Sequence, residues 1–302
     1  MSPKYEEAAI QVETAADQTD YRALLAVLRP SEWVIVCFFL FTALQSLAYE
    51  VTDARRALAF AGPLAYYALG YADSLRPRFW LSIVRDWIPS SLILVAYWQV
   101  DWFYQPGRLT EIERIWLDWD RVMLYGWGLR GAVEIFGAFV PAVLETCYAL
   151  LYVIPPFCVA SLYVLRRRDL VDRFQFTFML GTLLAYASLP HFPTASPRVE
   201  FPGLDLPTYL TAVRRFNIWL LNHGDIQASV FPSGHVATAF SAAFSMMLAV
   251  PERKWLVRGL VAMALAISTA TIYGRYHYAT DVLAGFALSL VAVAVTLVLR
   301  KD

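Results

Sequence analysis

Long apolar stretches alternate with short polar connections along almost the whole chain. A helix that crosses a membrane needs about 20 mostly apolar residues. The pattern therefore predicts an all-α protein, a polytopic membrane helical bundle of about eight transmembrane helices. The predicted spans are residues 33–49, 57–72, 87–104, 142–165, 174–190, 231–250, 255–273 and 282–299.

The composition supports a membrane protein, because 59% of the 302 residues are hydrophobic and only 17% are charged. Soluble domains carry about 45–50% apolar and about 25% charged residues. The formal net charge is zero, so no bulk attraction to nucleic acid is expected. The three cysteines lie in or beside apolar stretches and offer neither a disulfide framework nor metal-ligand spacing.

Basic residues orient the predicted spans, since cytoplasmic loops carry an excess of Lys and Arg. The runs that we assign to the cytoplasm are Arg166–Arg168, Arg253–Lys254 and Arg300–Lys301. Both termini then lie in the cytoplasm, and residues 1–30 form a polar cytosolic tail. The loops on the opposite face are 105–141, 191–230 and 274–281. Within the first of these, residues 111–129 mix acidic side chains with tryptophan, which predicts a helix lying in the membrane interface.

All four histidines fall at this opposite face, and ionisable groups near membrane spans are costly and usually functional. His277 and Asp281 are spaced i, i+4, so one face of a helix would bring them into contact. A carboxylate in that place holds one imidazole nitrogen protonated and aims the other outward, as a nucleophile or base requires. Arg275 adds a cation whose planar fork suits phosphate oxygens.

The stretch VFPSGHVATAF, residues 230–240, begins a predicted span with polar residues. A helix N-terminus presents unpaired backbone N–H groups and partial positive charge, which makes it a natural phosphate site. Gly234 would let an anion approach the backbone, Ser233 offers a hydroxyl, and His235 is placed to donate a proton to a leaving oxygen. The proline-rich loop 189–203 contains Arg198, which is either a second phosphate clamp or a surface arginine.

Taken together, these motifs resemble the type 2 phosphatidic acid phosphatase (PAP2) superfamily. The residues that carry the resemblance are Arg198, then Ser233, Gly234 and His235, then His277 with Asp281. The stretches FPTASPR, SVFPSGHVATAF and YGRYHYATDVLAG are similar to its Aur1-like branch, which includes inositol phosphorylceramide synthases and many bacterial homologues. The resemblance implies that residues 31–141 hold N-terminal membrane helices and the interfacial segment, and that residues 142–302 form the catalytic core.

The resemblance also implies a mechanism, in which His277 attacks phosphorus to form a phosphohistidine and Asp281 orients it. His235 protonates the leaving group, and the phosphate oxygens are held by Arg198, Arg275 and the backbone around Ser233 and Gly234. No metal or other cofactor is implied. The phosphoryl group then passes to water or to an acceptor alcohol of inositol or lipid type. The implied donor is a phospholipid, a prenyl phosphate or a sphingolipid-type phosphate, handled at the periplasmic face of a bacterial inner membrane.

The chain departs from the phosphatase members of that superfamily, because it lacks their KxxxxxxRP motif. Thr271 stands where those members carry an arginine, and Arg275 is expected to substitute for it. A non-catalytic lipid transporter or scramblase-like protein is the alternative, although few charges interrupt the spans apart from Asp101 and Glu145. Vanadium haloperoxidases share the phosphate pocket, but they are soluble bundles, unlike this chain.

The remaining polar and aromatic residues of the loops are expected to be structural or solvated. Those expected at the loop surface are His191 and His223. Those expected on the solvated face of the interfacial helix are Asp118, Asp120 and Arg121, with a role in capping the pocket or binding a headgroup as the alternative. Trp116, Trp119 and Trp127 are expected to anchor that helix at the membrane interface.

Overall fold

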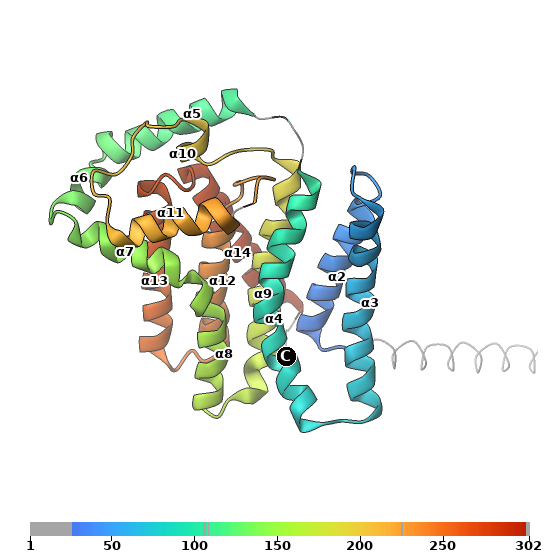
Figure 1. Ribbon diagram of the computed structural model, residues 1–302. Helices are drawn as coiled ribbons and strands as arrows, with labels where there is room; N and C mark the ends of the chain where they lie inside the picture. The colour runs from blue at the N-terminus through green and yellow to red at the C-terminus, as the bar shows by residue number, and fades with distance from the viewer. Residues whose placement is uncertain (1–25, 105–106, 108, 225, 300–302) are drawn as a thin grey trace, which may run out of the picture.

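The computed structural model describes residues 26–104, 107, 109–224 and 226–299, and all regular elements within these residues are helical (Figure 1). The prediction of an all-α fold is therefore confirmed for this part of the chain. Residues 1–25 of the predicted cytosolic tail and the basic pair Arg300–Lys301 lie outside the described residues.

The helices follow one another with short connections. In chain order they are α2 (Pro30–Gln45), α3 (Asp53–Leu75), α4 (Phe79–Val100) with η1 (Asp101–Phe103), α5 (Thr110–Arg121) with η2 (Val122–Gly126), α6 (Leu129–Glu134), α7 (Phe139–Ala149), η3 (Leu150–Val153), α8 (Ile154–Val164), η4 (Arg168–Leu170), α9 (Val171–Ser188), η5 (Leu189–His191), α10 (Pro197–Glu200), α11 (Ala212–Gly224), α12 (Gly234–Ala249), α13 (Lys254–Tyr273) and α14 (Ala279–Leu299).

Each of the eight predicted spans falls on one or more of these helices. Among the described residues, four helical stretches are long and apolar enough to cross a membrane. They are Phe79–Phe103, Phe139–Val164, Lys254–Tyr273 and Ala279–Leu299. Two shorter apolar helices are Pro30–Gln45 and Gly234–Ala249. The protein thus has the helices of an integral membrane protein, and the count of about eight spans stays a prediction.

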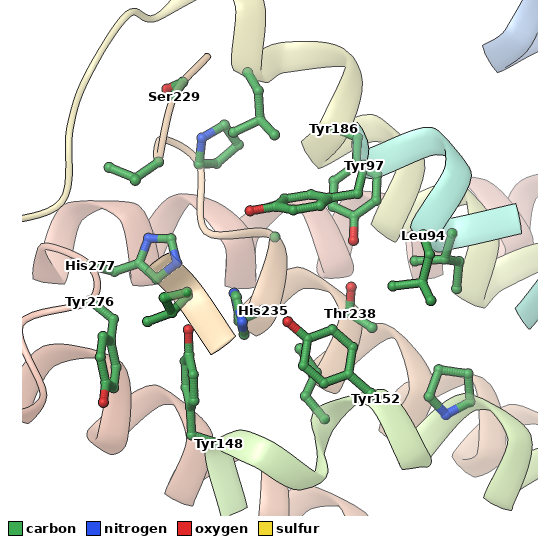
Figure 2. A pocket seen from close by; sticks show the side chains of 18 of the residues that line it. Leu94, Tyr97, Tyr148, Tyr152, Tyr186, Ser229, His235, Thr238, Tyr276 and His277 are labelled. Carbon is green, nitrogen blue, oxygen red and sulfur yellow. The ribbon is translucent and has the colours of Figure 1, made fainter. Parts of the chain in front are cut away.

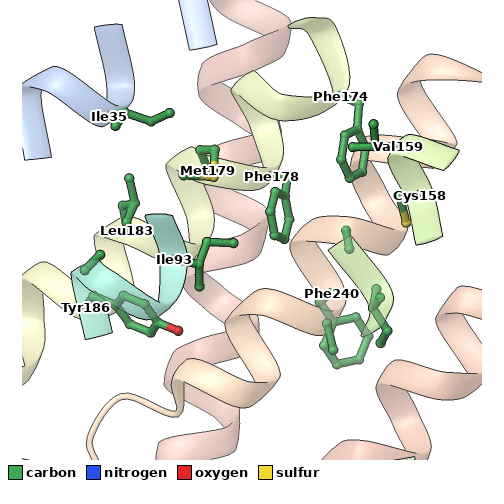
Figure 3. Close-up of a cluster of buried hydrophobic side chains, with 14 of the residues drawn as sticks. Ile35, Ile93, Cys158, Val159, Phe174, Phe178, Met179, Leu183, Tyr186 and Phe240 are labelled. Atoms are coloured by element: carbon green, nitrogen blue, oxygen red, sulfur yellow. The ribbon is translucent and has the colours of Figure 1, made fainter. Parts of the chain in front are cut away.

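Helix α9 forms the centre of the bundle and contacts α2, α4, α12 and α14. Twelve of its 18 residues are buried, so this helix is surrounded by protein rather than by lipid. Its side chains Phe174, Phe178 and Met179 pack with Ile93 of α4 and Phe240 of α12 in the main core (Figure 3). The apolar character of this helix therefore reflects packing inside the protein.

An ionic cluster lies at the end of the bundle where α2 and α4 begin. Arg85 of α4 donates to both carboxylate oxygens of Glu32, over 2.7 and 2.5 Å, and to Asp73 of α3 over 2.6 Å. All three side chains are almost completely buried. We call Arg85, Glu32 and Asp73 the Arg85 network. It joins α2, α3 and α4 through charges that are largely shielded from bulk solvent.

Asp86, the next residue along α4, receives hydrogen bonds from two further arginines. Arg29 donates to it over 2.5 Å and Arg168 over 2.6 Å. Arg167 pairs with Glu252 nearby, so the turns before α9 and α13 lie at this same end. The basic runs assigned to the cytoplasm by sequence therefore gather together where the structure describes them.

The opposite end of the bundle is covered by short helices that lie across it rather than along it. Helix α5 crosses above the long helices, with α10 and α11 beneath it (Figure 1). This orientation fits the predicted interfacial helix at residues 111–129, although the structure divides that segment between α5 and the π-helical turn η2. The loops that carry the predicted site residues lie under this cover.

Candidate active site

His277 lies in the loop between α13 and α14, and its orientation is fixed by the first turn of α14. Its Nδ1 is 3.2 Å from Oδ2 of Asp281. The same carboxylate oxygen accepts the backbone N–H of Tyr278 over 2.9 Å. Asp281 is fully buried and His277 is 6% exposed. The carboxylate therefore holds Nδ1, and Nε2 is left as the nitrogen available for chemistry.

His235 lies in the first turn of α12, and its ring centre is 5.6 Å from that of His277. Two residues earlier, Ser233 caps this helix with its hydroxyl, which accepts the backbone N–H of Val236. The backbone N–H of Ser233 donates to the carbonyl of Asp281 over 3.0 Å. This hydrogen bond ties the start of α12 to the start of α14 and brings the two imidazoles together.

Gly285 allows these two helices to approach. A Cβ atom at Gly285 would lie 2.5 Å from the carbonyl oxygen of Ser233 and 3.2 Å from the backbone nitrogen of Ala237. Both contacts are with backbone, which has little freedom to yield. The separation between the helices, and with it the distance between the histidines, is therefore set by main-chain contact.

Both histidines line a partly open cavity (Figure 2). Gly234 and Arg198 also line it, so the polar end combines two imidazoles, a helix N-terminus and a guanidinium. The remaining wall is mostly apolar or aromatic, and α4 and η3 contribute several of its residues, with Pro155 from α8. Its apolar members include Ile93, Leu94, Leu151 and Pro155. A ligand with a phosphate head and an apolar body would match this division.

The family model described as the PAP2 superfamily matches residues 135–295, which is more than half of the chain. The chain belongs to the PAP2 superfamily. A PA-phosphatase related-family protein of Dictyostelium discoideum is 33% identical over 105 residues, which cover 33% of this chain and 18% of that relative. No solved structure matches the chain.

Of the predicted phosphate ligands of this PAP2 protein, Arg198 and Gly234 lie at the cavity. The backbone N–H of Arg198 donates to the carbonyl of Arg275 over 3.2 Å, which joins α10 to the loop of His277. Ser233 is buried, and its hydroxyl is engaged as a helix cap rather than among the groups that line the cavity. The structure therefore gives Ser233 a positioning contact and leaves Gly234 as the exposed part of the helix N-terminus.

Arg275 occupies a different environment from the open clamp that the sequence suggested. It adopts a left-handed backbone conformation with φ of 63°. Its side chain is 1% exposed, and its Nη1 lies 2.6 Å from Oδ2 of Asp120. Among the described residues, its Nε and Nη2 have no hydrogen-bond partner. The guanidinium is thus buried and is not among the groups that line the cavity.

Asp120 is the residue that sequence reasoning misplaced. We expected it on a solvated face of the interfacial helix, but it is fully buried. One oxygen accepts from Arg275, and the other accepts the backbone N–H of Ala279 over 2.8 Å. Its partners lie 155 and 159 residues further along the chain. No local pattern could reveal contacts at that separation.

Trp116 also differs from its predicted role. It was expected to anchor the interface, but its ring stacks on Phe231 at 5.2 Å and meets Tyr278 edge-on at 5.5 Å. It therefore packs over the loops of the site. Trp119 and Trp127 are exposed as expected.

The two other histidines lie at the surface, near the ends of η5 and α11. His191 and His223 are both exposed, and neither lines the cavity. Nδ1 of His223 is 2.7 Å from the carbonyl of Trp219. Among the described residues, no group of three His, Cys, Asp or Glu side chains could hold a metal ion.

The environment of Asp120 predicts a pH dependence of stability. Burial raises the pKa of Asp120 from 3.8 to about 6, and the neighbouring Arg275 charge only partly opposes this. Between these values the folded protein binds more protons than the unfolded chain, so this group's contribution to stability falls as pH rises. Asp120→Asn removes the titration. We expect the variant to match the unaltered protein near pH 4 and to be more stable above about pH 6.

Thermal unfolding of both proteins in detergent, from pH 4 to pH 7, measures this difference. The difference in midpoint should grow across that interval and then level off. A constant difference over the whole interval would show that the pKa of Asp120 is not raised.

Proposed function

We propose that this PAP2 protein is an integral membrane lipid phosphatase or phosphotransferase that works through a phosphohistidine on His277. One observation carries the proposal: the ring centres of His235, on α12, and His277, in the loop before α14, lie 5.6 Å apart at the polar end of a cavity with a mostly apolar wall. A phosphorus atom bound between them would meet a nucleophile on one side and an acid on the other. The substrate we infer is a phospholipid, a prenyl phosphate or a sphingolipid-type phosphate.

In the first half-reaction, Nε2 of His277 attacks phosphorus while the bond from phosphorus to the leaving oxygen breaks. His235 gives its proton to that oxygen, so the product leaves as a neutral alcohol. Asp281 stabilises the positive charge that develops on the His277 ring. Arg198 and the backbone around Gly234 hold the phosphate oxygens.

In the second half-reaction, water or an acceptor alcohol attacks the same phosphorus. His235 accepts the proton of the attacking hydroxyl, and the bond between Nε2 and phosphorus breaks. Transfer to water yields inorganic phosphate, whereas transfer to an alcohol yields a new phosphate ester. The motifs similar to inositol phosphorylceramide synthases favour an acceptor of inositol or lipid type.

The site is proposed to face the non-cytoplasmic side, the periplasm if the source is bacterial. Arg29, Arg85 and Arg168 gather at the other end of the bundle through their shared carboxylates. Basic residues concentrate on the cytoplasmic side of membrane proteins. This arrangement supports a lipid phosphate donor reached from the outer leaflet.

Trapping the intermediate tests the proposal. The purified protein is mixed with a panel of ³²P-labelled lipid phosphates, quenched after milliseconds in alkali, and examined for label on the chain. Label should appear on the unaltered protein and be absent from His277→Ala, while His235→Ala should label slowly because it lacks the acid.

The exposed His223→Ala serves as the matched control and should label normally. Absence of label with every lipid phosphate, together with lipid flux that survives in the His277→Ala and His235→Ala variants, would overturn the proposal in favour of a non-catalytic lipid transporter. Supplying acceptor alcohols during turnover then separates the two branches, since a transferase would form a new ester and a phosphatase would release phosphate.

A further inference from the structure

The two histidines differ in how they are held. His277 has a carboxylate on Nδ1. Among the described residues, His235 has no ion pair, and its buried Nε2 has no hydrogen-bond partner. A ring that must deliver a proton along a defined direction needs some other constraint on its orientation.

Tyr148 of α7 supplies a flat surface against His235. The two rings are stacked at 4.6 Å with an interplanar angle of 11°. Tyr276 lies against Tyr148 in turn, at 4.5 Å and 25°. Figure 2 shows the rings of Tyr148 and Tyr276 beside the two histidines at one end of the pocket. Tyr148 is 1% exposed, so the stack has no room to slide into solvent.

The outer end of this stack is fixed by Glu145, one turn before Tyr148 on α7. Glu145 accepts from Tyr276 over 2.7 Å and from Arg214 of α11 over 2.7 Å. Asn217 adds a third hydrogen bond of 2.7 Å. Glu145 is 2% exposed, and its burial is costly unless its partners are in place. Glu145 is a charge within the predicted span 142–165, and these three hydrogen bonds stabilise it there.

Arg214 links this anchor back to the loop of His277. Its Nη2 donates to the carbonyl of Gly274 over 3.0 Å. Its guanidinium also lies over the ring of Tyr276, 5.4 Å from the ring centre. The buried anchor thus holds α7, α11 and the His277 loop in one arrangement.

We propose that Tyr148 is a positioning residue for His235: its ring, clamped by Tyr276 and the Glu145–Arg214 pair, aims the imidazole at the leaving oxygen. The inference rests on the proposed function, because it assumes that His235 is the general acid. Stacking restricts rotation of an aromatic ring without taking up either ring nitrogen. His235 can therefore stay oriented while both nitrogens remain available for proton transfer.

A misaligned acid has a specific kinetic signature. An alkoxide leaves poorly without a proton, whereas 4-nitrophenolate leaves without one. Misorientation of the His235 imidazole should therefore slow the release of an alkyl alcohol much more than the release of 4-nitrophenol. A general loss of folding or of substrate binding would slow both to the same extent.

The experiment compares octyl phosphate with 4-nitrophenyl phosphate as donors for the full-length protein in detergent. Tyr148→Leu keeps an apolar side chain but removes the flat face. We expect kcat for octanol release to fall by about 10- to 100-fold and kcat for nitrophenol release by about threefold or less, because general acid catalysis contributes about 10²–10⁴-fold. KM should change little for either donor. Tyr148→Phe restores the face and should return the ratio of the two rates to the unaltered value.

Two controls keep this result separate from the proposed function. Tyr71→Leu, at an exposed position on α3, should leave both rates unchanged. His235→Ala should show the same preference for the nitrophenyl donor as Tyr148→Leu, and more strongly. If His235→Ala shows the preference but Tyr148→Leu slows both donors equally, the role of Tyr148 is overturned and the proposed function stands. If His277→Ala still releases both alcohols, the proposed function itself fails.

Discussion

Asp281→Asn should reduce kcat by about 10³- to 10⁴-fold, with a small effect on KM, by analogy with the loss of the orienting carboxylate in a catalytic triad. In the structure, Oδ2 of Asp281 faces Nδ1 of His277 at 3.2 Å and also accepts the Tyr278 N–H. Asparagine keeps the shape but can keep the Tyr278 bond only by turning its carbonyl oxygen toward that N–H. In that orientation the same oxygen still accepts from Nδ1, but it carries no negative charge to stabilise the ring as the bond to phosphorus forms. In the opposite orientation the amide N–H₂ faces Nδ1, the ring proton moves to Nε2, and the nucleophile is lost.

The measurement is single-turnover kinetics with the lipid phosphate that labels the unaltered protein most strongly. Asp118→Asn is the matched control, since the Asp118 side chain is 70% exposed and lies 3.9 Å from its nearest cation. That variant should retain full activity. If Asp281→Asn stayed within tenfold of the unaltered rate, the orientation of His277 would not depend on this carboxylate.

Arg85→Ala should lower the free energy of unfolding by about 3–5 kcal/mol, since it strands buried carboxylates that have lost their cation. Glu32 and Asp73 receive short hydrogen bonds from the Arg85 guanidinium, and Glu32 is 1% exposed. Glu32, the more deeply buried of the two carboxylates, would keep its charge with little access to solvent. Unfolding is measured by titrating the protein in a mild detergent with a denaturing detergent. The variant should reach its unfolding midpoint at a lower fraction of the denaturing detergent.

A surface pair at the same end provides the comparison. Arg167 and Glu252 are about half exposed, with side chains at 42% and 53%, and such pairs contribute about 0–1 kcal/mol. Arg167→Ala should therefore shift the midpoint little. A variant that replaces Arg85, Glu32 and Asp73 together by Met, Gln and Asn should recover much of the stability lost in Arg85→Ala. If the single variant were as stable as the unaltered protein, the carboxylates of the Arg85 network would have to be solvated.

The helical fold could be predicted because apolar stretches of span length have few alternatives to a helix in a membrane. What the pattern could not reveal is which helices face lipid. Helix α9 is apolar because it is enclosed by other helices, and residues such as Gln175 and Thr177 are buried in it. A helix enclosed by protein and a helix surrounded by lipid are both apolar, so hydropathy alone does not distinguish them.

The candidate site also combines contacts that the sequence can predict with contacts that it cannot. The pairing of His277 with Asp281 is local, and its spacing on a helix is sufficient to predict the contact. The start of α12 at Gly234 follows from the polar residues around it, of which Ser233 is the cap. By contrast, Asp120 meets Arg275 only through the path of the chain across the top of the bundle. Tyr148 stacks on His235 for the same reason, and no spacing rule connects those positions.

The main-chain contact between Gly285 and Ser233 has a consequence for how such a protein could acquire new substrates. Because α12 and α14 touch through backbone at Gly285 and the Ser233 N–H donates to the Asp281 carbonyl beside this contact, widening the gap between the two histidines to admit a bulkier molecule would break that hydrogen bond. Additional room that keeps this hydrogen bond has to come from the far wall, where Ile93, Leu94 and Pro155 line the cavity. Changes that alter the choice of lipid are therefore expected to map to α4 and α8, where they leave the reaction chemistry untouched.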